Sequence, residues 1–364
     1  MRPTAYIAPV LSGLASIQHH AQQWYLDKGL SWPQQPPVNK IDLHHHFVPD
    51  FYAQAVEDAG GDPSGWPTPR WSPSSSRMIM KHLGVQSAIL SVPAPGPLIV
   101  SDPAAQAALA RRLNEFAARI RDEDHYTFGF FASLPDITNT SAALEEIAYA
   151  LDVLGADGVT LFTRYGGNAT YLGNPILEPV WRELDQRGAT VFVHPTHGVE
   201  AELVNPNVAM PVVDYPHETT RTAVDMIASR TLKKFPNVKV VLSHAGGTLP
   251  FLAGRLLNLL TPKQASWWSV ATTHDEAKEA VRSFYYDLAL STSKEALQAL
   301  LEVVPAGHVV YGSDFPYAPS AAYPAFLDDL EGFNLTKEER EGINFGNAQA
   351  LIPRLGKQVE ISEL

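Results

Sequence analysis

The sequence predicts a (β/α)8 barrel, because short apolar strands and helical segments alternate along the chain from residue 39 onward. Each expected strand is rich in branched or aromatic residues, as are strands buried on both faces. A doubly wound open sheet is the rival architecture, but no GxGxxG fingerprint follows the first strand. The eight expected strands cover residues 40–47, 86–92, 126–134, 157–163, 190–195, 238–245, 284–290 and 309–316.

Helical segments are expected between these strands, and Pro175 and Ser293 stand where helices commonly begin. In such a barrel the strands are parallel and the active-site groups gather at their C-terminal ends. The expected helices cover residues 103–121, 141–154, 175–187, 218–235, 249–260, 293–303 and 322–330.

Two regions are predicted along the chain. Residues 1–38 form an N-terminal helical extension, with a helix over 15–26 and a proline-rich linker, SWPQQPP, over 31–37. Residues 39–364 form the barrel and a C-terminal helix. The first 20 residues carry one arginine and an apolar stretch interrupted by Pro9, which makes a poor secretory signal, so we expect a cytoplasmic protein.

Composition narrows the classes of partner. The chain has 364 residues, 45% hydrophobic and 18% charged, which is typical of a globular protein. A formal net charge of −12 without a lysine- or arginine-rich block disfavours nucleic acid. No apolar run reaches the roughly 18 residues that a membrane span needs. Because cysteine is absent, any metal must be bound by His, Asp or Glu.

Unusual polar residues stand at the C-terminal ends of four expected strands: the triplet His44–His46, His194, His244 and Asp314. A single histidine at a strand end is more often a hydrogen-bonded structural residue than a ligand. Several such groups at one barrel mouth favour a metal site, because without an ion they would be buried unmatched.

Strand alternation divides the triplet in DLHHHFVP. His44 and His46 share a face and can bind one ion, whereas His45 points to the helical layer and is expected to be structural. Imidazoles and a carboxylate with water in an open position suit one Zn²⁺ ion and would accept Mn²⁺. The fourth strand, DGVTLFT, has no lysine that could be carbamylated to bridge two metals.

These residues resemble the amidohydrolase superfamily, in its branch around aminocarboxymuconate-semialdehyde decarboxylase. The resemblance spans roughly residues 39–355 and rests on Asp42-Leu43-His44-His45-His46, VFVHP, SHAGGTLPFLAGR and YGSDFP. Further stretches are similar to the fungal 6-methylsalicylate decarboxylases, namely HHHFVPDFY, GGDPSGWPTP, ADGVTLFTRYGG, HPTHG, DYPHETTRTAVD and LSHAGGTLPFL.

The resemblance implies metal ligands and a catalytic histidine. His44, His46, His194 and Asp314 match the ligands, and His244 matches the catalytic histidine. It also implies two arginines that bind the substrate carboxylate. Arg70 matches the first, with different local spacing, and Arg255 matches a second that is lent across the interface of a homodimer.

The implied reaction is the non-oxidative loss of CO2 from a small hydroxyaromatic acid in secondary metabolism, with 6-methylsalicylate giving 3-methylphenol. The metal would chelate the carboxylate and the ortho-hydroxyl, and Asp314, assisted by His244, would carry a proton to the ring. Further substrate contacts are expected from Arg164, an anion binder, and from His197 on the loop after the fifth strand. The expected aromatic walls, which could equally be core residues, are Phe131, Phe162, Phe315 and Tyr317.

Two rival functions remain open. A metal-bound hydroxide beside His and Asp could instead hydrolyse a small lactone or amide. A catalytically silent barrel that binds only a metal or a partner is disfavoured, because all the expected site groups are present.

The segment 214–219, DYPHET, is expected to be either a loop that touches substrate or the start of a helix.

Overall fold

A computed structural model describes residues 39–166, 170–198, 202–259 and 272–356. The predicted extension at residues 1–38 and the end of the chain after residue 356 lie outside these ranges. Eight parallel strands form one sheet, in the order β1-β2-β3-β4-β7-β8-β9-β10. Their bounds are β1 Lys40–His46, β2 Val85–Ser91, β3 Phe128–Ala132, β4 Gly158–Phe162, β7 Thr190–His194, β8 Lys239–Leu242, β9 Tyr285–Asp287 and β10 Val309–Val310.

The sheet curves round until its first and last strands meet. A parallel bridge joins His45 to Phe315, and the backbone N–H of Leu43 donates to the carbonyl of Tyr311 at 3.0 Å. The predicted (β/α)8 barrel is therefore confirmed, with every expected strand in place and most of them shorter than expected.

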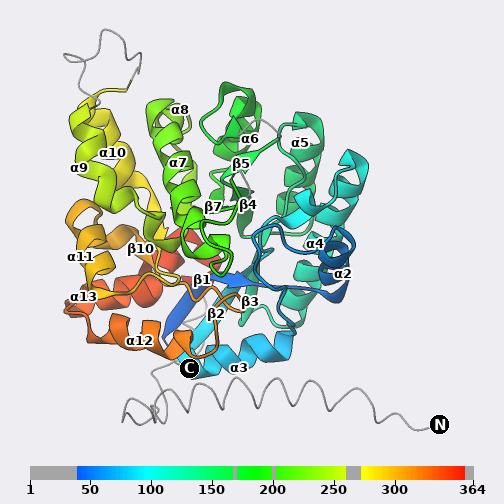
Figure 1. The fold of residues 1–364 in the computed structure, drawn as a ribbon, viewed down its shortest axis with the longest axis horizontal. Coiled ribbons are helices and arrows are strands. Elements are labelled where there is room, and N and C mark those ends of the chain that lie inside the picture. Colours follow the sequence, from blue (N-terminus) through cyan, green and yellow to red (C-terminus); the bar gives the residue numbers. More distant parts are fainter. Residues whose placement is uncertain (1–38, 167–169, 199–201, 260–271, 357–364) are drawn as a thin grey trace.

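Helices surround the strands, with α9, α10 and α11 on the left of Figure 1 and α2 and α4 on the right. The expected helices are present, and a π-helical turn, Tyr149–Val153, continues α5. They are α4 Pro103–Glu123, α5 Thr140–Ala148, α6 Glu178–Gln186, α7 Asp214–Ala228, α8 Thr231–Lys234, α9 Leu249–Leu259, α11 Lys294–Val303 and α12 Ala322–Gly332.

Several helices were not expected from the sequence. The start of α3, PSSS, is typical of a loop, yet Ser72 and Ser75 form a capping box that begins the helix. Thr273 and Glu276 do the same for α10. The unexpected helices are α2 Asp50–Asp58, α3 Pro73–Leu83 and α10 His274–Ser283. The last described part of the chain, toward which a C-terminal helix was predicted, contains three short helices, α13 Lys337–Glu341, α14 Asn347–Leu351 and α15 Pro353–Gly356.

The C-terminal helices close one end of the barrel. Leu351 and Ile352 pack with Leu43, Phe131 and Phe192 in the cluster that fills the barrel interior. The hydroxyl of Thr190, the first residue of β7, donates to the carbonyl of Leu351 at 3.2 Å. Because this contact is at the N-terminal end of a strand, the C-terminal ends remain available for a site.

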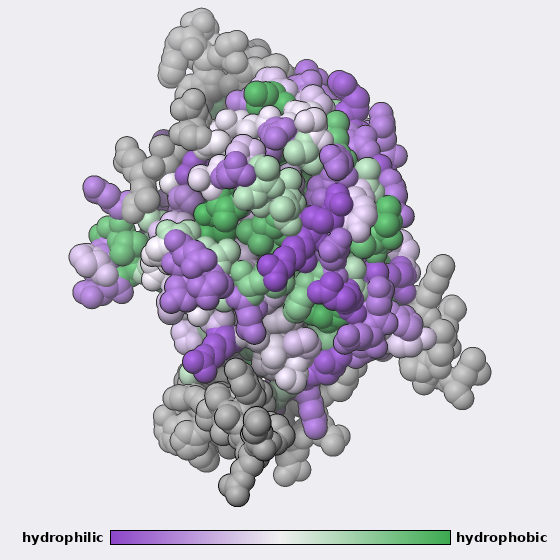
Figure 2. All heavy atoms as spheres, turned by 90° about the vertical axis from the view of Figure 1, so that its right-hand side faces the viewer, coloured by the Kyte–Doolittle hydropathy of each residue, from purple (hydrophilic) through white to green (hydrophobic). Residues whose placement is uncertain are grey.

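The outer surface is mixed in character. On the face drawn in Figure 2, hydrophilic side chains cover much of the area between smaller hydrophobic patches. Within the described part of the chain, no helix has the length and apolar character needed to cross a membrane.

Candidate metal centre and active-site cavity

The four predicted ligands meet at the C-terminal mouth of the barrel. One ligand atom from each of His44, His46, His194 and Asp314 lies within 4.8 Å of all the others, and all four side chains are buried. The Nε2 atoms of His44 and His46 are 3.0 Å apart. Oδ1 of Asp314 lies 3.3 Å from Nε2 of His44 and 3.1 Å from Nε2 of His46.

The other ring nitrogen of each histidine has its own acceptor. Nδ1 of His44 donates to Oδ2 of Asp287 at 3.0 Å, Nδ1 of His46 to the carbonyl of Ser91 at 3.2 Å, and Nδ1 of His194 to the carbonyl of Pro195 at 2.7 Å. With the proton on Nδ1, each Nε2 presents a lone pair to the common centre, as metal-binding histidines do.

The centre therefore attracts positive charge, because imidazole lone pairs and a carboxylate converge on it. Oδ1 of Asp314 is buried without a hydrogen-bond donor among the described residues. Three imidazole lone pairs and one carboxylate at such distances repel one another unless a cation lies between them. The donor set fits a divalent metal such as zinc or manganese.

The electrostatics of the four groups show how strongly they interact. Burial alone would lower the pKa of His44, but the charges of Asp287 and Asp314 outweigh it and raise this pKa to about 10. Burial lowers the pKa of His46, and it lowers that of His194 further, with help from the neighbouring histidines. The histidines hold the pKa of Asp314 well below its usual range, although burial opposes this.

The division of the histidine triplet is confirmed, since His45 faces away from the centre. Its Nδ1 contacts Oδ2 of Asp42 at 3.0 Å, and its Nε2 contacts the hydroxyl of Ser76 in α3 at 2.8 Å. Simple alternation would also place Asp42 inside the barrel, but the pairing of β1 with β2 shifts register between Asp42 and His45. Leu43 therefore packs in the interior while His44, next to it, enters the centre.

Asp287 is a site residue that the sequence reasoning missed. It is fully buried at the end of β9. While Oδ2 holds His44, Oδ1 accepts the backbone N–H groups of His244 at 3.1 Å and Ala289 at 2.9 Å. The signal was available, because a lone carboxylate inside the apolar segment FYYDLAL is costly to bury unless it is paired.

His244 is held beside the centre by its backbone and by its ring. Its φ of 54° is in the left-handed region, as is that of Asp314 at 60°. Such strain is common at functional sites. Nδ1 donates to the carbonyl of Ala289 at 3.0 Å, so Nε2 is the atom free to exchange a proton.

A cavity of about 410 Å³ opens above the ligands, a volume suited to a small molecule. His46, His194, His244 and Asp314 form its floor. The remaining lining is mostly apolar or aromatic, and comprises Asp62, Ser64, Trp66, Pro93, Ala94, Pro211, Val212, Tyr215, Pro216, Leu290, Ser291, Tyr317, Ala318, Pro319, Ala322 and Phe326.

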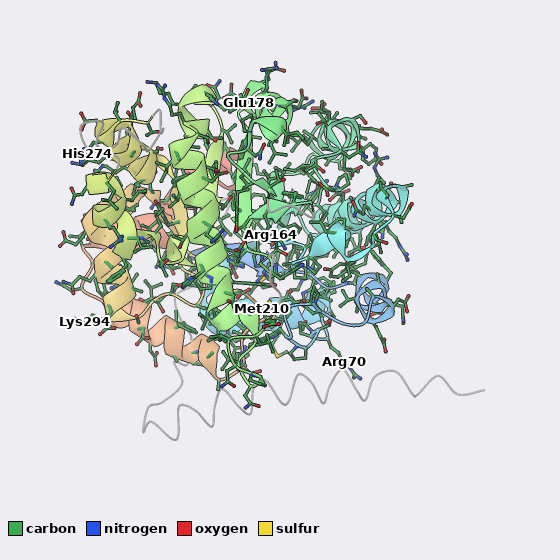
Figure 3. All side chains as sticks on the ribbon, turned by 45° about the horizontal axis from the view of Figure 1, so that its top comes forward. Arg70, Arg164, Glu178, Met210, His274 and Lys294 are labelled. Atoms are coloured by element: carbon green, nitrogen blue, oxygen red, sulfur yellow. The ribbon has the colours of Figure 1, made fainter. Side chains whose placement is uncertain are left out.

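The three arginines expected to bind substrate are absent from the described lining of this cavity. Arg70 is exposed and lies at the lower edge of the molecule in Figure 3. Arg164 is buried, and its guanidinium donates to the carbonyls of His197 and Gly198, each at 2.8 Å. Arg255 is exposed on α9.

Among the other residues expected to contact substrate, some line the cavity and others do not. His197 is half-buried and, like Phe315, is not among the described lining residues. The ring of Phe315 packs 5.1 Å from that of His45, so it faces the helical layer. Phe131 belongs to the barrel interior and Phe162 to the outer core, whereas Tyr317 lines the cavity.

The segment 214–219 is the start of α7 rather than a loop.

Fold and site together define a (β/α)8 barrel enzyme with a candidate metal centre and a cavity at the C-terminal mouth. A family model described as Amidohydrolase matches residues 41–354, and the chain belongs to this family. It is 48% identical over 316 residues to a protein of Penicillium expansum named 6-methylsalicylic acid decarboxylase, covering 87% of this chain and 97% of that relative.

Solved structures share the fold. A crystal structure titled amidohydrolase II superposes with a TM-score of 0.76 at 30% identity, covering 86% of this chain and 99% of the other. A dihydroxybenzoic acid decarboxylase from Polaromonas, solved with bound manganese and the inhibitor 2-nitroresorcinol, gives a TM-score of 0.69 at 20% identity, over 86% and 97% of the two chains.

Proposed function

We propose that the protein removes CO2 non-oxidatively from a small hydroxyaromatic acid, with 6-methylsalicylate as substrate and 3-methylphenol as product. The observation that carries the proposal is the four-ligand centre at the floor of an apolar cavity, in a chain similar to 6-methylsalicylic acid decarboxylase along most of its length. Secondary metabolism and a cytoplasmic location remain predictions from the sequence.

We propose Zn²⁺ as the resident ion, bound by His44, His46, His194 and Asp314, with Mn²⁺ as the alternative. Manganese is the ion of the Polaromonas structure. Such an ion would hold the carboxylate and the ortho-hydroxyl of the substrate and polarise its ring.

We assign the proton that replaces CO2 to Asp314 and His244. Because its pKa is held well below the usual range, Asp314 is a carboxylate at neutral pH and can pass on a proton only after receiving one. His244 lines the same cavity with Nε2 free, so it can take up a proton from solvent at Nε2 and pass that proton to Asp314.

A homodimer is part of the proposal. Phe251 is 83% exposed and Leu259 is 42% exposed on α9, and Arg255 lies between them at helical spacing. Burial of this face against a second copy would cover the apolar side chains and carry Arg255 toward the neighbouring subunit. This supports Arg255 as the arginine lent to the partner's substrate.

The test is to incubate metal-loaded protein with 6-methylsalicylate and to follow CO2 and 3-methylphenol together. Release of both in equal amounts supports the proposal. No product, together with turnover of a panel of small lactones and amides, would show that the centre is hydrolytic. Gel filtration with light scattering tests the dimer, and a monomer at assay concentration would remove it.

A further inference from the structure

We infer that Asp62 selects the substituent at the end of the aromatic ring farthest from the metal ligands, favouring a hydroxyl group and rejecting a second carboxylate. The inference rests on the proposed function, because it concerns the substrate of the same cavity. It names a specificity-determining residue that lies outside every motif of the metal centre.

Asp62 belongs to the segment between α2 and α3, and it lines the same cavity as the metal ligands. Its Oδ1 accepts the backbone N–H of Ser64 at 2.8 Å, which fixes the turn that carries it. The carbonyl of Ser64 in turn accepts the backbone N–H of Met210 at 3.0 Å. This contact fastens the turn to the loop that precedes α7 and holds Asp62 at the cavity wall.

Two tyrosines relate Asp62 to the metal centre. The ring of Tyr317 packs 5.4 Å from that of His46, and the ring of Tyr215 packs 6.2 Å from that of His194. Burial raises the pKa of both tyrosine hydroxyls, and the negative charge of Asp62 raises them further. The hydroxyl of Tyr215 is hydrogen-bonded to the side chain of Ser64, two residues after Asp62. The phenol ring of Tyr215 therefore lies between His194 and the turn that carries Asp62.

A salicylate ring is the same size as the phenol ring of Tyr215, which lies along this wall of the cavity. With the carboxylate on carbon 1 and the hydroxyl on carbon 2 at the metal, carbons 4 and 5 are the ring positions farthest from it. A substituent on either carbon would approach Asp62. The described lining contains two acidic residues, and the other one, Asp314, belongs to the metal centre.

The charge of Asp62 is not offset within the cavity, because no lysine or arginine is found among its described lining residues. A ring hydroxyl would donate to this carboxylate, and hydrogen bonds to charged acceptors are stronger than neutral ones. A second carboxylate would meet a like charge at a site where little water screens it. Burial also raises the pKa of Asp62, as expected for a carboxyl group that lacks a cation.

The experiment compares the metal-loaded wild type with Asp62→Asn, which keeps an oxygen to accept the N–H of Ser64. Calorimetry gives the affinity for salicylate, 2,4-dihydroxybenzoate, 2,5-dihydroxybenzoate and 2-hydroxyterephthalate. Turnover of the same acids and of 6-methylsalicylate is measured in parallel. Asp58→Asn is the matched control, because Asp58 is exposed at the end of α2 and outside the cavity lining.

We expect Asp62→Asn to lower the affinity for at least one dihydroxy acid, relative to salicylate, by about tenfold. It should raise the relative affinity for 2-hydroxyterephthalate, and Asp58→Asn should change neither ratio. Ratios that are the same in wild type and Asp62→Asn, or a failure of all these acids to bind, would overturn the inference. Shifted ratios without turnover of any acid would instead uphold Asp62 and refute the decarboxylase proposal.

Discussion

The substitution Asp287→Asn tests whether the carboxylate behind His44 sets the metal affinity of the centre. Asp287 uses one oxygen for Nδ1 of His44, at 3.0 Å, and the other for the backbone N–H groups of His244 and Ala289. Asparagine has nearly the same shape but offers a single oxygen, so it can satisfy one of these two sides.

Either orientation of the amide carries a cost. If its NH2 faces His44, the ring must shift its proton to Nε2, and the lone pair that should bind the metal is lost. If its NH2 faces the two backbone N–H groups, buried donors oppose one another, at about 1–3 kcal/mol for each unsatisfied group. Loss of such a supporting contact typically weakens metal binding by about 10–100-fold. That range corresponds to about 1.4–2.8 kcal/mol.

The assay is a competition titration of metal-free protein against a chelator of known affinity. Asp225→Asn is the matched control, because Asp225 lies in α7 away from the centre and its carboxylate accepts the backbone N–H of Gly173, at 2.7 Å. We expect the control to bind metal like the wild type. Wild-type metal affinity in Asp287→Asn would refute the idea that Asp287 orients His44.

Three further predictions follow from the same geometry. His45→Ala should lose about 2 kcal/mol of stability, because it breaks the buried contacts to Asp42 and Ser76, while metal content stays near one ion per chain; loss of the metal first would contradict this. Chelation should lower Tm, and an ion at 100 times its Kd should restore about 2.7 kcal/mol; a Tm unaffected by chelation would exclude a metal bound by the folded state. Arg255→Ala should raise KM for the substrate by about tenfold or more with stability unchanged within about 0.5 kcal/mol; an unchanged KM would remove the contact between subunits.

The sequence was sufficient for the barrel and for the convergence of its ligands. Buried parallel strands are apolar along their whole length, and the polar residues that interrupt them stand out at His44, His46, His194 and Asp314. Because the C-terminal ends of all strands meet in a closed barrel, linear positions were enough to predict a shared centre.

What could not be predicted depends on where side chains point. Arg164 follows β4 after a single residue, yet it donates to the loop carbonyls of His197 and Gly198 rather than to the cavity. The register shift in β1, which places Leu43 and His44 on the inner side together, is a property of strand pairing and has no marker in the sequence. Asp62 comes from a loop, and loops have no period from which their contacts with a distant site could be inferred.

The most direct measurement is to determine metal content and CO2 release together in the wild type and in His44→Ala, with 6-methylsalicylate as substrate. The structure places Nε2 of His44 within 3.3 Å of both His46 and Asp314, so its removal should destroy the centre. We predict about one ion per chain and equal amounts of CO2 and 3-methylphenol for the wild type, and neither metal nor product for the variant. A metal-free His44→Ala protein that still releases CO2 would contradict the account.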